Sequence, residues 1–162
     1  NTLLFHGSVI AVDGEAYLFT AKSGTGKSTH TKLWRKYFGN RAVMVNDDKP
    51  LLKVTGKGVL ACGTPWAGKD HLQNNIMVPL KAVCILERDT VNHIEQIRKR
   101  DAWKMILQQS YRSDQPAVLS STIRLAEQIM DKTKLYRLGC NMSMQAVETS
   151  YNGMNTDIDY AD

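Results

Sequence analysis

Two β-prone apolar runs open the chain and meet at a tight turn. Residues 4–12 and 15–21 flank Asp13-Gly14, a dipeptide typical of two-residue hairpin turns. The second run breaks into a loop that contains glycine, and residues 28–38 then carry apolar side chains at helical spacing. The pattern therefore predicts a strand, a loop and a helix, with the loop fed by an antiparallel hairpin rather than by a parallel sheet.

The rest of the chain alternates between short apolar segments and longer amphipathic ones. A second antiparallel hairpin is expected around residues 55–57. The elements together predict an α/β fold, a single domain over residues 1–162 with a mixed, partly antiparallel sheet and flanking helices. Because no Met leads the sequence, the chain could also be the C-terminal part of a longer one. Further strands are predicted at residues 41–45, 51–54, 58–62, 79–87, 92–97 and 134–138, and helices at residues 101–111, 116–132 and from 143.

Composition places the chain among globular proteins. Hydrophobic residues make up 43% and charged residues 23%, no apolar run approaches the length of a membrane span, and the first residues lack a basic leader. The 3 cysteines are odd in number and widely spaced, which favours reduced thiols over a disulfide or metal framework. We therefore expect a cytoplasmic protein with no membrane partner.

The net charge of +5 raises the question of a nucleic-acid partner. The basic residues are scattered along the chain instead of gathered into one stripe, and the densest group, at residues 98–104, is most simply a solvated face. An anionic nucleotide is a sufficient explanation for the charge. We therefore expect a nucleotide ligand and no nucleic acid.

The loop after the first hairpin has the composition of a phosphate-binding loop. Gly24 and Gly26 permit backbone conformations in which successive N–H groups converge on an anion. Lys27 would supply a positive charge for the β- and γ-phosphates of ATP, and the Ser28 hydroxyl is a candidate ligand for Mg²⁺. A strict motif has glycine where this chain has Ala21, so the prediction depends on the strand, loop and helix around it. The predicted nucleotide-binding residues are Ser23, Gly24, Thr25, Gly26, Lys27, Ser28 and Thr29.

A pair of carboxylates, Asp47 and Asp48, follows the next predicted strand, 20 residues after Lys27. Ligand groups of α/β proteins collect at strand ends, so the pair can face the γ-phosphate of a nucleotide bound by the loop. Neighbouring residues on a strand point to opposite sides, so the two carboxylates should have different roles unless the backbone turns there. The alternative is simple turn chemistry, because Asn-Asp-Asp before Lys-Pro is also a good turn sequence.

Three segments of the chain together resemble the catalytic domain of the HPr kinase/phosphorylase family. They are Phe5-His6-Gly7, the loop Ser23-Gly24-Thr25-Gly26-Lys27-Ser28, and Val45-Asn46-Asp47-Asp48, in the family's order and spacing. The loop is also similar to that of ATP-dependent phosphoenolpyruvate carboxykinase. The resemblance covers residues 3–88 and implies a mixed, antiparallel-containing P-loop core in which a phosphoryl donor modifies a serine hydroxyl.

The resemblance also implies roles for individual residues. Lys27 and Ser28 take the phosphate and metal roles, Asp47 the general-base role, and Asp48 a supporting role at the metal. His6 matches an active-site histidine of the family and could orient phosphate or Asp47, although a histidine packed at a strand edge explains it equally well. Members of the family assemble into oligomers, so a homo-oligomer is implied as well.

The chain departs from the family in the region after the second hairpin. The family carries a Glu-containing signature there, whereas residues 60–69 hold no Glu, so the resemblance does not extend to the reverse phosphorylase reaction or to HPr as substrate. Residues 65–69 instead form a candidate loop for recognition of the acceptor. Trp66 could stack on a ligand and Lys69 could contact phosphate, unless this is an ordinary surface loop with the indole in the core. Arg112 is a further candidate phosphate contact, or a solvated charge after a helix.

These expectations define a kinase that uses ATP and Mg²⁺ to phosphorylate a hydroxyl. The acceptor would be a peptide, a protein or a small molecule, most simply a serine side chain. The alternative is a regulatory protein or ATPase that binds a nucleotide and has no acceptor. Intact Lys27, Ser28, Asp47 and Asp48 speak against a scaffold with a degenerate loop.

Overall fold

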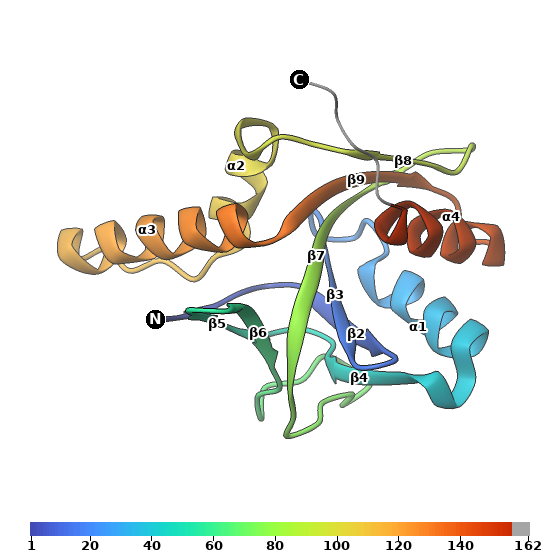
Figure 1. The fold of residues 1–162 in the computed structure, drawn as a ribbon, viewed down its shortest axis with the longest axis horizontal. Helices are drawn as coiled ribbons and strands as arrows, with labels where there is room; N and C mark the ends of the chain where they lie inside the picture. Colours follow the sequence, from blue (N-terminus) through green and yellow to red (C-terminus); the bar gives the residue numbers. More distant parts are fainter. Residues whose placement is uncertain (157–162) are drawn as a thin grey trace.

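The structure, a computed structural model, describes residues 1–156 and places the first hairpin where the sequence predicts it (Figure 1). Strands β2 (Ser8–Val12) and β3 (Glu15–Thr20) pair antiparallel. Asp13 and Gly14 join them with φ angles of 52° and 83°, and two positive values are what a type I′ turn needs. On its other side β3 runs parallel to β7 (Met77–Arg88), so the sheet is mixed at this point.

The single strand predicted over residues 4–12 is wrong, because this run forms two strands in different parts of the sheet. Strand β1 (Thr2–Leu4) pairs with β5 (Leu51–Thr55), and only from Ser8 does the chain join β3. Between them, the His6 amide donates to the carbonyl of Gln109 and the Gly7 amide to that of Asp48. The backbone amides of His6 and Gly7 are therefore satisfied by partners outside the strand pairing. These two residues connect the part of the sheet that contains β1 to the part that contains β2.

Strand β7 joins the two parts of the sheet. Its first residues pair antiparallel with β6, and the remainder pairs in parallel with β3 and β9. Nine strands of residues 1–156 take part, in the order β1-β5-β6-β7-β3-β2-β4, while β9 pairs with β7 and β8 pairs with β9. The strands not yet given bounds are β4 (Ala42–Asn46), β6 (Gly58–Cys62), β8 (His93–Gln96) and β9 (Lys134–Cys140).

Helices cover both faces of this sheet and create two cores. Alternation along β3 sends Tyr17 and Phe19 to the core that contains Trp34, and Leu18 to the core that contains Ile106. Helices α1 (Lys27–Phe38) and α4 (Met144–Asn155) pack together on the first face, and α2 (Lys99–Gln109) and α3 (Pro116–Lys132) contact each other on the second (Figure 1). A short 3-10 turn, η1 (Gly39–Arg41), follows α1.

Two predictions from composition can be compared with this structure. In residues 1–156, no helix has both the length and the apolar character needed to cross a membrane. All 3 cysteines are free thiols, in agreement with the absence of a disulfide framework in the sequence.

Candidate active site

The loop of residues 21–26, which we call the β3–α1 loop, connects the end of β3 to the first turn of α1. Gly24 and Gly26 have φ angles of 79° and 110°, in the left-handed region that residues with a side chain rarely adopt. Gly26 is also the N-cap of α1 and offers no side-chain cap. The first amides of α1 are therefore not capped by a side chain, and the positive end of the helix dipole is directed at this loop.

Lys27 lies at the start of α1 and folds back over the β3–α1 loop. Its Nζ donates a hydrogen bond to the carbonyl oxygen of Ala21 at 3.3 Å. Partial burial lowers the pKa of the ammonium group, and the nearby carboxylate of Asp48 opposes that shift without cancelling it. An anion in front of the loop would give this half-buried cation a charged partner.

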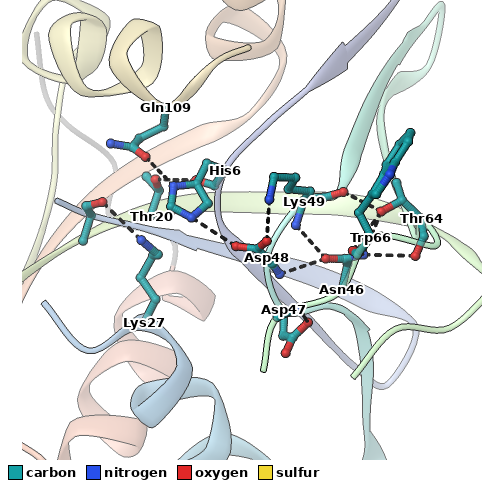
Figure 2. Close-up of polar contacts among 12 residues, drawn as sticks. His6, Thr20, Lys27, Asn46, Asp47, Asp48, Lys49, Thr64, Trp66 and Gln109 are labelled. Atoms are coloured by element: carbon teal, nitrogen blue, oxygen red, sulfur yellow. Dashed lines mark hydrogen bonds and ion pairs between the residues drawn. The ribbon is translucent and has the colours of Figure 1, made fainter. Parts of the chain in front are cut away.

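The two carboxylates lie in the turn after β4, so this turn and not the alternation of a strand sets their directions. Asn46 ends the strand, and its Oδ1 accepts the backbone amides of Asp48 at 2.8 Å and Lys49 at 2.7 Å. Figure 2 shows the side chain of Asp48 pointing toward His6 and Lys49, while that of Asp47 points away from them. The Asx-type turn therefore gives the two carboxylates different surroundings.

Asp48 is held between two basic side chains. Its Oδ1 lies 3.1 Å from Nε2 of His6, and its Oδ2 accepts a hydrogen bond of 2.7 Å from Nζ of Lys49. Burial raises the pKa of Asp48, but Lys49 and His6 together outweigh this effect and lower it. The other ring nitrogen of His6, Nδ1, is 3.0 Å from Oε1 of Gln109, so His6 connects the end of α2 to the turn after β4 (Figure 2).

Asp47 has quite different contacts. Only 8% of the residue is exposed, and its Oδ1 accepts the backbone amide of Gly68 at 2.8 Å. Its Oδ2 receives no hydrogen bond from any of residues 1–156. A Cβ atom at Gly68 would lie 2.8 Å from this Oδ2, so glycine is needed for the close approach. Asp47 thus keeps one carboxylate oxygen available to a ligand.

One cavity of about 580 Å³ brings these groups together. The β3–α1 loop and the start of α1 form one wall, and His6, Asp47 and Asp48 form another. Its volume lies in the range typical of small-molecule sites. The predicted residues that line it are His6, Ser23, Gly24, Gly26, Lys27, Ser28, Thr29, Asp47, Asp48 and Lys69.

Three predicted site residues lie outside the lining of this cavity. Thr25 belongs to the β3–α1 loop, but its hydroxyl donates to the carbonyl of Lys22 within the loop. Trp66 is 55% exposed and is held through its carbonyl oxygen, which accepts a 2.8 Å hydrogen bond from Asn46 Nδ2. Arg112 is exposed after the end of α2. Roles for these three in ligand binding stay predictions.

Other residues of the cavity were not predicted from the sequence. Gly68, Asp70, Arg88 and Met142 line it. Arg88 is the last residue of β7, and β7 runs parallel to β3. Had the sequence predicted this parallel pairing, Arg88 would have been expected near the loop that follows β3. Met142 covers Gly26 so closely that a Cβ atom there would lie 2.8 Å from its methyl group.

The donors in the cavity fit a Mg²⁺ ion shared with phosphate. Among residues 1–156, no group of 3 or more His, Cys, Asp and Glu side chains is arranged to hold a metal ion by itself. Magnesium in nucleotide sites usually needs only one or two carboxylates, because phosphate oxygens and waters complete its shell. Ser28 and Asp48 line the same cavity, so a hydroxyl and a carboxylate are available there to such an ion.

Comparisons with known proteins give a limited result. No protein-family model matches the chain, and no curated protein matches it. Among solved structures, it is similar to the Hpr(Ser) kinase/phosphatase from Coxiella burnetii, with a TM-score of 0.47 and 10% sequence identity over 92% of this chain and 94% of that chain. At this similarity the match assigns neither a family nor a function to the chain.

Proposed function

We propose that this protein is a kinase that uses ATP and Mg²⁺ to transfer the γ-phosphoryl group to a hydroxyl, most simply a serine of a peptide or protein. One observation carries the proposal. A single cavity is lined by a glycine-containing loop at a helix start, by Lys27, and by Asp47 and Asp48, whose carboxylates have different surroundings. Phosphoryl transfer requires these components: an anion clamp, ligands for a metal ion and a group that positions the acceptor hydroxyl.

The loop side of the cavity would bind the nucleotide phosphates. The first amides of α1 and the ammonium of Lys27 are positive groups directed toward the same space. The hydrogen bond from Lys27 to the Ala21 carbonyl, at 3.3 Å, is longer than a good charged contact and would be exchanged for a phosphate oxygen. When bound, Mg²⁺ would neutralise charge on the phosphates, with Ser28 and Asp48 as its protein ligands.

Asp47 would accept the proton of the attacking hydroxyl. One of its oxygens is fixed by the amide of Gly68, and the other is without a hydrogen bond from residues 1–156. Asp48 is less suited to this role because Lys49 and His6 hold its pKa low, so its carboxylate is a weak proton acceptor. The different partners of Asp47 and Asp48 therefore favour Asp47 as the base.

Two substitutions test the proposal. Asp47→Asn should abolish transfer from γ-labelled ATP while changing the Kd for ATP less than about threefold, because it removes the base but not the phosphate clamp. Lys27→Ala should weaken ATP binding itself by about tenfold or more. Full transfer activity in the Asp47→Asn protein would show that the base is misassigned.

The acceptor can be sought with the same label. Transfer into serine-containing peptides, including any encoded beside the gene, should be compared with transfer into small hydroxyl compounds. ATP binding without incorporation into either class would favour the alternative, a nucleotide-binding regulator or ATPase in which the two aspartates serve only the metal.

A further inference from the structure

Arg88 makes contacts that the proposed kinase site has not yet used. Strand β7 runs parallel to β3 with Ile85 beside Thr20, so it continues for 3 residues after β3 has ended and reaches the β3–α1 loop. There the Arg88 Nη2 donates to the carbonyl oxygen of Gly24, and its Nε lies 3.4 Å from the carbonyl oxygen of Thr25. Arg88 is also one of the residues that line the candidate nucleotide cavity.

Contact with these carbonyls constrains the amides of the β3–α1 loop. In a planar trans peptide the carbonyl and the N–H point in opposite directions, and the Thr25 carbonyl shares its peptide group with the Gly26 amide. Arg88 therefore directs the Gly26 N–H away from itself. This amide donates no hydrogen bond to any of residues 1–156, whereas the Thr25 amide is already used by the Lys22 carbonyl at 3.2 Å.

The charge of Arg88 has a second consequence. Carbonyl oxygens that faced a bound phosphate would repel it. The Gly24 and Thr25 carbonyls would make no such contact with phosphate, because the guanidinium group holds both of these oxygens by hydrogen bonds. It also adds a third cationic side chain to the cavity that Lys27 and Lys69 line. The planar fork of arginine suits two neighbouring acceptors, which a lysine ammonium could reach only singly.

We propose that Arg88 is a positioning residue of the phosphate site, which turns the carbonyls of Gly24 and Thr25 away from the ligand so that the Gly26 amide faces it. This inference rests on the proposed nucleotide binding and adds a residue that lies outside the loop motif. Arg88 acts here through the backbone of the loop, and its positive charge supports the same anion as Lys27.

The test compares Arg88→Met with Arg88→Lys and with a matched control, Arg41→Met. Arg41 is also an exposed arginine with hydrogen-bonded partners, but it pairs with Asp13 at the opposite end of β3. Both methionine variants remove one positive charge. Binding of ATP and of inorganic pyrophosphate would be measured by calorimetry, and the amide resonance of Gly26 by NMR with and without pyrophosphate.

Arg88→Met should weaken both ligands by about tenfold, Arg88→Lys should recover part of that loss, and Arg41→Met should change binding less than about twofold. Arg88→Met should also move the Gly26 amide resonance in the unliganded protein and reduce its shift on addition of pyrophosphate. Unfolding midpoints of the variants would verify that they are folded.

The possible failures point to different conclusions. Equal binding by Arg88→Met and Arg41→Met, with Lys27→Ala still weakened, would overturn the role of Arg88 and leave the proposed function intact. If the unmodified protein bound neither ATP nor pyrophosphate, the proposed function would fail. The Gly26 resonance of the unliganded variants would then still decide whether Arg88 orients the loop, and an unchanged resonance in Arg88→Met would overturn it.

Discussion

The buried histidine of α1 makes the stability of this protein depend on pH. His30 is 2% exposed and lies against the ring of Phe19 with centroids 4.8 Å apart. Its Nε2 accepts a hydrogen bond from the indole of Trp34 at 3.0 Å, while its Nδ1 has no partner among residues 1–156. Burial lowers the pKa of His30 from 6.5 to about 4, because the apolar surroundings disfavour the charged ring.

The sign of the effect follows from the proton balance. Between pH 6.5 and about 4 the unfolded chain binds a proton at His30 that the folded chain excludes. The contribution of His30 to stability is therefore complete above the unfolded pKa and is lost as the pH falls through this window. The difference between the unfolded and folded pKa values of His30 corresponds to a loss of about 3 kcal/mol in the free energy of unfolding at low pH. About 2 kcal/mol of this loss occurs between pH 7 and pH 5.

Urea unfolding of the native chain and of His30→Leu at several pH values measures this contribution. Trp34 keeps an acceptor in the variant, because Ser150 Oγ lies 3.1 Å from the same indole nitrogen. The difference between the two free energies of unfolding should change by about 2 kcal/mol between pH 7 and pH 5, since the variant lacks the titrating group.

A substitution in the same core that removes no titratable group separates this effect from general acid unfolding. Ile10 is fully buried, and Ile10→Val should lower the free energy of unfolding by a similar amount at pH 7 and pH 5. Parallel stability curves for His30→Leu and the native chain over the same pH range would refute the argument from burial.

Further changes test the site and the fold. Gly68→Ala would place a Cβ atom 2.8 Å from Asp47 Oδ2, so transfer in a labelled-ATP assay should fall by about tenfold or more while the Kd for ATP stays within about twofold. Asn46→Ala removes a fully buried side-chain amide, which accepts a hydrogen bond from the backbone N–H of Asp48 and donates one to Thr64 Oγ1. Urea unfolding should show that the free energy of unfolding falls by about 2 kcal/mol or more. Gly14→Ala is strained at a φ angle of 83° and should lower the free energy of unfolding by about 1 kcal/mol. Chelation of Mg²⁺ should abolish transfer, and its return should restore activity.

The parts of the fold that sequence could predict are those with local causes. Asp13-Gly14 imposes a turn through its own backbone preferences, and helical spacing after Lys27 is a property of consecutive residues. The turn at residues 46–48 is the alternative that Asn-Asp-Asp before Lys-Pro offered in the sequence, and Asn46 bonds the amides of its own turn. Such features do not depend on where the rest of the chain lies.

The parts that sequence could not predict depend on distant partners. The apolar run of residues 4–12 has no internal sign that its beginning pairs with β5 and its end with β3. Gln109 bonds the ring of His6 across 103 positions, and Arg88 reaches the Gly24 carbonyl across 64. Contacts at these separations follow from the order of the strands, which apolar spacing alone does not specify.

The central position of β7 also has a consequence for the order in which the protein opens. Its pairing with β3 and β9 joins segments that are far apart in the chain, so these ladders close large loops and should form late in folding. Once formed, β7 has neighbours on both edges and buried side chains on both faces over Ala82, Val83, Cys84, Ile85 and Leu86. Its amides are therefore expected to exchange with solvent mainly through global unfolding. The β3–α1 loop and Arg88 are thus attached to the slowest-opening part of the molecule, so the cavity can keep its shape while surface segments fluctuate around it.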